Sequence, residues 1–162
     1  MRLILLMRHG KSDWDFAGVS DFNRPLSEKG IQDVLRQGQA LLKTGYRPDR
    51  ILSSPAIRAW HTAHLMAQVT SLPHEAVQAE AGFYREEVDA IYHALQSLPQ
   101  SVSTVLLVGH NPLWSELASK WAQSSFELST SEIVGFGYEG GWNEIGVTFS
   151  PFSYLFYLRR TG

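Results

Sequence analysis

The sequence contains no cysteine. This absence excludes disulfide bonds, catalysis by a thiolate and zinc sites built from cysteine ligands. Long apolar runs are missing as well. The apolar run near the start, at 3–7, is only five residues long and ends at Arg8 and His9. A signal peptide needs a core of roughly 7–15 apolar residues, and a membrane helix needs about 20. We therefore expect a cytoplasmic protein that does not contact a membrane.

The chain also carries little net charge, at −2 over 162 residues. This balance argues against a general nucleic-acid-binding protein and against a strongly basic membrane-binding surface. The length suits one domain with a substantial core, and neither an internal repeat nor a second domain is evident. We expect a single domain that spans 1–162, and a monomer.

Segments typical of strands and of helices alternate along most of the chain. Short apolar runs bounded by turn residues predict strands, and apolar residues at helical spacing predict helices. Ser27 and Ser54 are expected to cap two of the helices. The alternation predicts a three-layer α/β/α sandwich with a mostly parallel central sheet. Strands are expected at 3–7, 50–53, 77–80, 104–108, 133–138, 145–149 and 154–158, and helices at about 28–44, 54–69, 88–95 and 112–121.

Three polar clusters each follow an apolar strand directly. In open parallel sheets, ligands bind outside the carboxyl ends of the strands, so these clusters should converge on one crevice. Two of the clusters open onto helix starts, where free backbone N–H groups favour an anion. The crevice is therefore expected to hold two arginines and two histidines around an anion site. The clusters are Arg8-His9-Gly10, Ser53-Ser54-Pro55 with Arg58 one helical turn later, and Gly109-His110-Asn111-Pro112.

These residue types suit the transfer of a phosphoryl group, whose negative charge spreads over three oxygens. Arginine offers a fork of N–H donors that matches phosphate. A neutral imidazole can attack phosphorus and hold the phosphoryl group covalently. A second histidine can donate to the phosphoryl oxygens, and Gly10 lets the backbone approach the ligand closely. This scheme needs neither a metal nor another cofactor.

The same residues resemble the motifs of the histidine phosphatase superfamily, which includes the phosphoglycerate mutases. The short length and the last strand pair, with Trp142 in a turn, are similar to SixA-type phosphohistidine phosphatases. The resemblance extends from Leu3 to about Phe152 and implies a phosphoglycerate mutase-like fold. The matching stretches are Arg8-His9-Gly10, Arg24-Pro25-Leu26-Ser27 with Gly30, Ser53-Ser54-Pro55 with Arg58-Ala59 and Thr62-Ala63, and Gly109-His110-Asn111-Pro112.

The resemblance implies roles for five residues. His9 would be the nucleophile that becomes phosphorylated, and Arg8, Arg58 and His110 would complete the phosphate pocket. Arg24 occupies the position from which an arginine of the first loop reaches the phosphate in SixA-type members. The implied partner is a phosphohistidine-bearing protein of a signalling relay.

The residue that protonates the leaving group is not evident. Larger members use a glutamate in an acidic, glycine-rich motif, from which the stretch with Glu80 and Glu86 departs. An imidazole leaves more easily than an alkoxide because its basicity lies near neutrality, so a site without a strong acid favours phosphohistidine. Besides these two glutamates, the candidates are three aspartates of the first loop: Asp13, Asp15 and Asp21.

Three other functions stay open. One is a phosphatase that acts on a small phosphorylated metabolite or on a phosphoserine-type protein, and this activity requires a working general acid. The second is a mutase, which the short chain disfavours. The third is a phosphate-binding module without turnover, which the presence of His9 disfavours.

Other residues have less specific interpretations. His61 and His64 lie three residues apart on one expected helix, but two histidines without a third ligand are weak evidence for a metal. A surface or packing role is therefore favoured for both. Trp14 and Phe16, in the loop at 10–26, could contact another protein if they are exposed, or could be buried beneath the loop.

Overall fold

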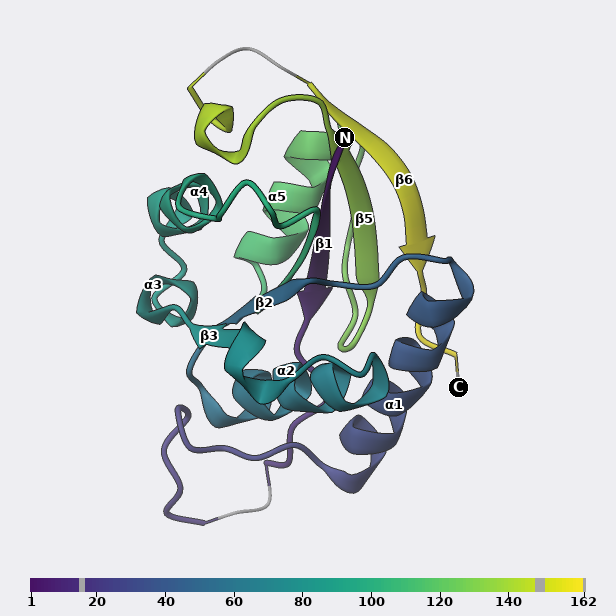
Figure 1. Ribbon diagram of the computed structural model, residues 1–162. Helices are drawn as coiled ribbons and strands as arrows, with labels where there is room; N and C mark the ends of the chain where they lie inside the picture. The colour runs from purple at the N-terminus through teal and green to yellow at the C-terminus, as the bar shows by residue number, and fades with distance from the viewer. Residues whose placement is uncertain (15–16, 148–150, 162) are drawn as a thin grey trace.

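The computed structural model describes residues 1–14, 17–147 and 151–161. Within them, a central six-stranded sheet has the strand order β3-β2-β4-β1-β5-β6 (Figure 1). The pairs β1–β4, β2–β4 and β2–β3 are parallel, whereas β5 is antiparallel to both of its neighbours. The mostly parallel sheet is thus confirmed. Its strands are β1 (Arg2–Arg8), β2 (Arg50–Ser53), β3 (Val77–Ala79), β4 (Thr104–Gly109), β5 (Ile133–Tyr138) and β6 (Phe152–Leu158).

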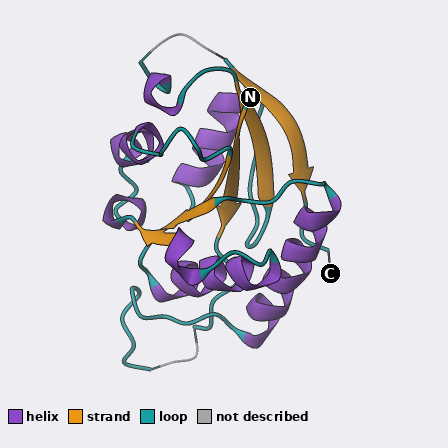
Figure 2. Ribbon diagram, viewed as in Figure 1, coloured by secondary structure: helices purple, strands orange, loops and turns teal. Residues whose placement is uncertain are grey.

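Helices cover both faces of this sheet, as the sandwich prediction requires (Figure 2). Helices α1 (Glu28–Lys43) and α2 (Ile57–Val69) pack on one face, together with Leu5 and Met7 of β1. Helices α3 (Ala81–Tyr84), α4 (Val88–Gln96) and α5 (Leu113–Ala122) pack on the other face, together with Ile4 and Leu6. Alternate residues of β1 therefore face opposite layers, which is why the strand is apolar at every position from Leu3 to Met7.

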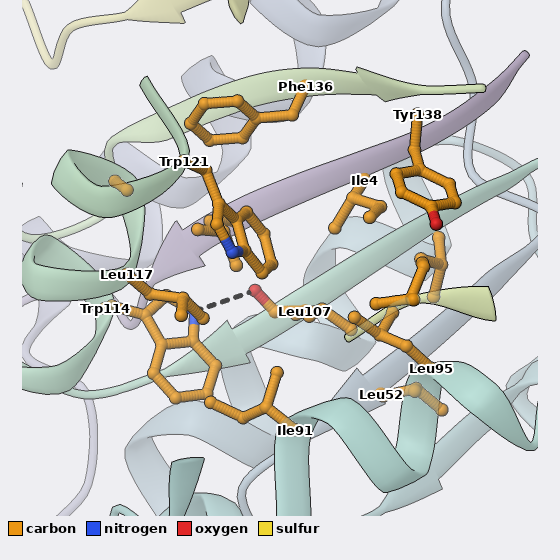
Figure 3. Packing of buried hydrophobic residues seen from close by; sticks show 14 of the residues in the cluster. Ile4, Leu52, Ile91, Leu95, Leu107, Trp114, Leu117, Trp121, Phe136 and Tyr138 are labelled. Atoms are coloured by element: carbon orange, nitrogen blue, oxygen red, sulfur yellow. Dashed lines mark hydrogen bonds between the residues drawn. The ribbon is translucent and has the colours of Figure 1, made fainter. Parts of the chain in front are cut away.

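The core on the second face is rich in aromatic side chains (Figure 3). The Trp114 ring is fully buried, and its indole Nε1–H donates to the carbonyl oxygen of Leu107 at 3.2 Å, so its polar group is paired. Burying such a ring without that partner would carry a desolvation cost. The contact holds α5 against β4 close to the carboxyl end of this strand, which His110 follows directly. None of the helices in the described part of the chain could span a bilayer.

Two local predictions were wrong. Ser54 does not cap α2, which begins at Ile57 with Ala56 as its N-cap, because the Ser54 hydroxyl is hydrogen-bonded to His110 and to the N–H of Ala56. The strand expected at 145–149 is a turn over its described part, residues 145–147, following a short 3₁₀ helix at Trp142–Glu144. Ile145 is buried in the core on the face covered by α4, whereas Val147 is exposed, so this segment does not pair with the sheet. Residues 148 and 149 lie outside the described residues.

Candidate active site

The site lies at the carboxyl ends of three neighbouring parallel strands, β2, β4 and β1. The backbone N–H of His9 donates to the carbonyl of Gly109 at 3.0 Å, and that of Ser54 donates to the carbonyl of Val108 at 3.0 Å. These bonds hold the three polar clusters side by side. A cavity of about 500 Å³ opens there, and all five predicted site residues line it, namely Arg8, His9, Arg24, Arg58 and His110.

The imidazole of His9 is oriented by its own neighbour. Its Nδ1 lies 2.6 Å from the carbonyl oxygen of Gly10. Because a carbonyl oxygen can only accept, Nδ1 carries the hydrogen and Nε2 keeps its lone pair. Burial, together with the charges of nearby groups, lowers the pKa of His9 to about 3, although the Gly10 contact opposes the shift. The ring is therefore neutral at physiological pH, with Nε2 available as a nucleophile.

His110 is the second imidazole of the cavity, with its ring centroid 5.1 Å from that of His9. Its Nε2 lies 2.8 Å from the Ser54 hydroxyl, while its Nδ1 is buried without a hydrogen-bond partner among the described residues. Burial and the charge of Arg58 lower the pKa of His110 to about 4, so this ring is also neutral. Sequence reasoning missed the role of Ser54, because a serine before a helix is usually read as a cap.

Asp21 joins the first loop to the rest of the site. Its carboxylate accepts hydrogen bonds from Nη2 of Arg24 at 3.0 Å, from Nη2 of Arg58 at 3.1 Å and from the Tyr84 hydroxyl at 3.0 Å. Its backbone carbonyl also accepts from Nη1 of Arg58 at 2.7 Å. Burial raises the pKa of Asp21, but the bonds from Arg24, Tyr84 and Arg58 outweigh it and lower the pKa to about 2. Asp21 is therefore ionised and cannot act as a general acid near neutral pH.

Several guanidinium donors of the cavity are left for a ligand. Four of these nitrogens are buried and have no hydrogen-bond partner among the described residues: Nε of Arg8, Nε of Arg58, and both Nε and Nη1 of Arg24. Buried donors are normally paired, and leaving one unpaired costs about 1–3 kcal/mol. A bound anion with several oxygens would satisfy these donors at once. The cavity therefore combines unpaired cationic donors with one nucleophilic nitrogen.

The candidate general acids occupy different places. Glu86 lines the cavity, and its Oε1 accepts from the backbone N–H of Leu113 at 3.1 Å, at the start of α5. Glu80 does not line the cavity, although burial raises its pKa. Asp13 lines a neighbouring groove instead, and Asp15 lies outside the described residues. Two of the candidate acids thus line the cavity, Asp21 and Glu86, and Asp21 is ionised.

The remaining histidines are not gathered into a metal site. His64 contacts His74 instead of His61, and the Nδ1 atoms of His64 and His74 lie 2.6 Å apart. Among the described residues, no group of three or more potential metal-ligating side chains is arranged to hold an ion. Trp14 is not buried, since 75% of it is exposed, and the Arg24 guanidinium lies 3.5 Å from its ring centroid. Phe16 lies outside the described residues.

Comparison with known proteins identifies the family to which the chain belongs. The family model of the histidine phosphatase superfamily (branch 1) matches residues 4–83. A protein of Arabidopsis thaliana, described as uncharacterized and chloroplastic, is 32% identical over 155 residues, which cover 88% of this chain and 70% of the relative. The chain belongs to the histidine phosphatase superfamily.

Further comparisons show the range of this superfamily. The 2,3-bisphosphoglycerate-dependent phosphoglycerate mutase of Clavibacter michiganensis is 40% identical over 68 residues, or 26% of that enzyme. The structure of the protein histidine phosphatase SixA complexed with tungstate has a TM-score of 0.81 and 24% identity, covering 97% of this chain and 96% of that one. The likeness to SixA confirms the fold. The superfamily thus includes phosphatases and mutases, and these matches leave the substrate open.

Proposed function

We propose that this protein is a phosphatase that works through a phosphohistidine on His9, and that its substrate is a phosphohistidine on another protein. The observation that carries the proposal is the state of His9. Its ring is neutral, its Nδ1–H is committed to the Gly10 carbonyl, and its Nε2 is left free at a cavity with unpaired arginine donors. Such a nitrogen is an activated nucleophile beside an anion site.

In the first step, Nε2 of His9 attacks the phosphorus of the substrate. The bond from phosphorus to the substrate nitrogen breaks, and the leaving imidazole keeps the electron pair. In the second step, water attacks the phosphorus of phospho-His9, the P–Nε2 bond breaks, and inorganic phosphate leaves with the oxygen of water. The Gly10 carbonyl stabilises the imidazolium formed in the intermediate, because it accepts the Nδ1 hydrogen throughout.

Arginine and histidine side chains would hold the phosphoryl oxygens in both steps. The buried donors of Arg8, Arg24 and Arg58 are already in place, so they need little reorganisation when charge develops. His110 can add one more donor. If the Ser54 hydroxyl donates to Nε2 of His110, Nδ1 carries the hydrogen of the neutral ring and can point it at a phosphoryl oxygen.

Two arguments support phosphohistidine as the substrate. An imidazole that is protonated on its other nitrogen is a good leaving group, so the reaction does not depend on a strong acid. The carboxylate that is most firmly tied into the site, Asp21, is ionised and cannot supply a proton. The fold likeness to the protein histidine phosphatase SixA supports the same substrate class.

Glu86 favours a second candidate, a phosphatase of small phosphate monoesters. It lines the cavity, and a carboxylic acid there could protonate an alkoxide as it leaves. The match to a phosphoglycerate mutase supports this alternative as well.

The test compares two substrates under the same conditions. One is a histidine-containing phosphotransfer domain phosphorylated with phosphoramidate, and the other is an alkyl phosphate monoester. We expect wild type to prefer the phosphoprotein strongly, and His9→Asn to lose at least about 1000-fold in kcat/KM because the nucleophile is gone. His93→Asn is the matched control, since His93 is an exposed histidine of α4. An acid-labile phosphoryl label should be trapped on wild type and absent from His9→Asn.

Other outcomes would contradict the proposal. If the monoester is hydrolysed as well as the phosphoprotein, and Glu86→Gln abolishes only that reaction, the second candidate replaces the first. If His9→Asn keeps wild-type turnover, the mechanism itself is wrong.

A further inference from the structure

Trp14 is a large apolar side chain that the fold leaves uncovered. It is 75% exposed, the largest exposed fraction among the big hydrophobic residues of the described chain. It lies on the lining of the catalytic cavity, where its ring stacks on the Arg24 guanidinium at 3.5 Å. Exposed tryptophans at the edge of a binding site are frequent anchors for a partner, because they bury much area at little cost in side-chain entropy.

A second groove adjoins the catalytic cavity at this residue. It encloses about 370 Å³ and shares Lys11, Ser12 and Trp14 with the cavity. Beyond Trp14 it continues along Asp13, Ser27 and Lys29 at the start of α1. We call these six residues the Trp14 groove.

The six residues of the Trp14 groove carry a formal charge of +1. Lys11 and Lys29 contribute two cations, and Asp13 contributes one anion. Lys11 is exposed, and Lys29 keeps about half of its side chain in solvent while it pairs with Asp33. Exposed cations of this kind steer an acidic partner and are screened by salt.

We propose that the Trp14 groove receives the polypeptide segment that flanks the phosphohistidine of the substrate protein, with an apolar side chain on Trp14 and acidic side chains beside Lys11 and Lys29. This proposal rests on the proposed function and adds where the substrate protein docks. A phosphohistidine that enters the cavity brings its own backbone to the rim, and Trp14 is part of that rim. A small phosphorylated molecule would contact the cavity alone.

The experiment measures kcat/KM for two substrates that share the chemistry but differ in size. These are the phosphorylated phosphotransfer domain and free phosphoramidate. We expect Trp14→Ala to lower kcat/KM for the phosphorylated domain about tenfold relative to kcat/KM for phosphoramidate, as the loss of an interface anchor does. Lys29→Gln should lower kcat/KM for the protein about threefold and weaken its salt dependence, because one steering charge is lost. It should leave phosphoramidate hydrolysis unchanged, because Lys29 lies outside the catalytic cavity. Val147→Ala, at a site 73% exposed and outside the groove, is the control.

Three results would overturn the inference. If Trp14→Ala lowers both values equally, Trp14 acts only through Arg24. If neither value changes, nothing docks on the groove. If wild type hydrolyses phosphoramidate but not the phosphoprotein, the proposed function fails before any variant is tested, so the two failures can be told apart.

Discussion

The neutral state of His9 predicts a loss of stability in mild acid. In the folded chain its pKa is about 3, whereas an unfolded histidine titrates at its ordinary value of 6.5. Between these pH values the unfolded chain binds a proton that the folded chain does not. The contribution is therefore fully present above pH 6.5 and is lost as the pH falls towards 3. Between pH 7 and pH 5 one such group costs about 2 kcal/mol of unfolding free energy.

His110 titrates in the same direction, with a folded pKa of about 4, and should add a similar loss. The two histidines together then remove about 4 kcal/mol between pH 7 and pH 5, out of a typical total of 5–15 kcal/mol. The stability of the protein is thus coupled to the proposed chemistry, because the burial that keeps His9 neutral also makes its protonation costly.

The assay is urea unfolding of wild type and His9→Asn at pH 7 and pH 5. Asparagine keeps an N–H that can donate to the Gly10 carbonyl but cannot titrate. We expect the variant to lose about 2 kcal/mol less than wild type between the two pH values. His93→Asn, at an exposed site, should follow wild type. If His9→Asn and wild type show the same pH dependence, His9 titrates normally in the folded protein and the reasoning is refuted.

Two other substitutions test the scaffold of the site. Asp21→Ala removes the carboxylate that ties the first loop to Arg58 and Tyr84, a contact worth roughly 1 kcal/mol at a half-exposed group. Amide exchange in the loop should therefore accelerate about fivefold, and unchanged hydrogen–deuterium exchange there would contradict this. Gly109→Ala places a Cβ 2.3 Å from the ring of Trp114, which overpacks the core. Urea unfolding should show a destabilisation of about 1–3 kcal/mol. An unchanged free energy of unfolding would mean that the ring can shift freely.

Local patterns were sufficient to predict the scaffold, and the five candidate site residues that they indicated line one cavity. The strands predicted at 3–7, 50–53 and 104–108 have apolar centres, and each leads into one of the three polar clusters. Since the carboxyl ends of parallel strands meet at one edge of a sheet, the convergence of His9 and His110 could be expected once their strands were predicted to be parallel. The turn at 145–147 was mispredicted because Ile145 and Val147 are β-branched residues at the spacing of a strand, although only Ile145 is buried.

The sequence by itself determined the α/β sandwich and indicated which histidines and arginines share one crevice, because these depend on periodicity and on motifs that lie within a few residues of each other. Only the tertiary structure decided what Asp21, Ser54 and Trp14 do. Asp21 contacts Arg58 and Tyr84 across 37 and 63 positions of the chain, and Ser54 contacts His110 across 56. Side-chain partners that distant are brought together by the packing of whole elements, and no local pattern encodes them.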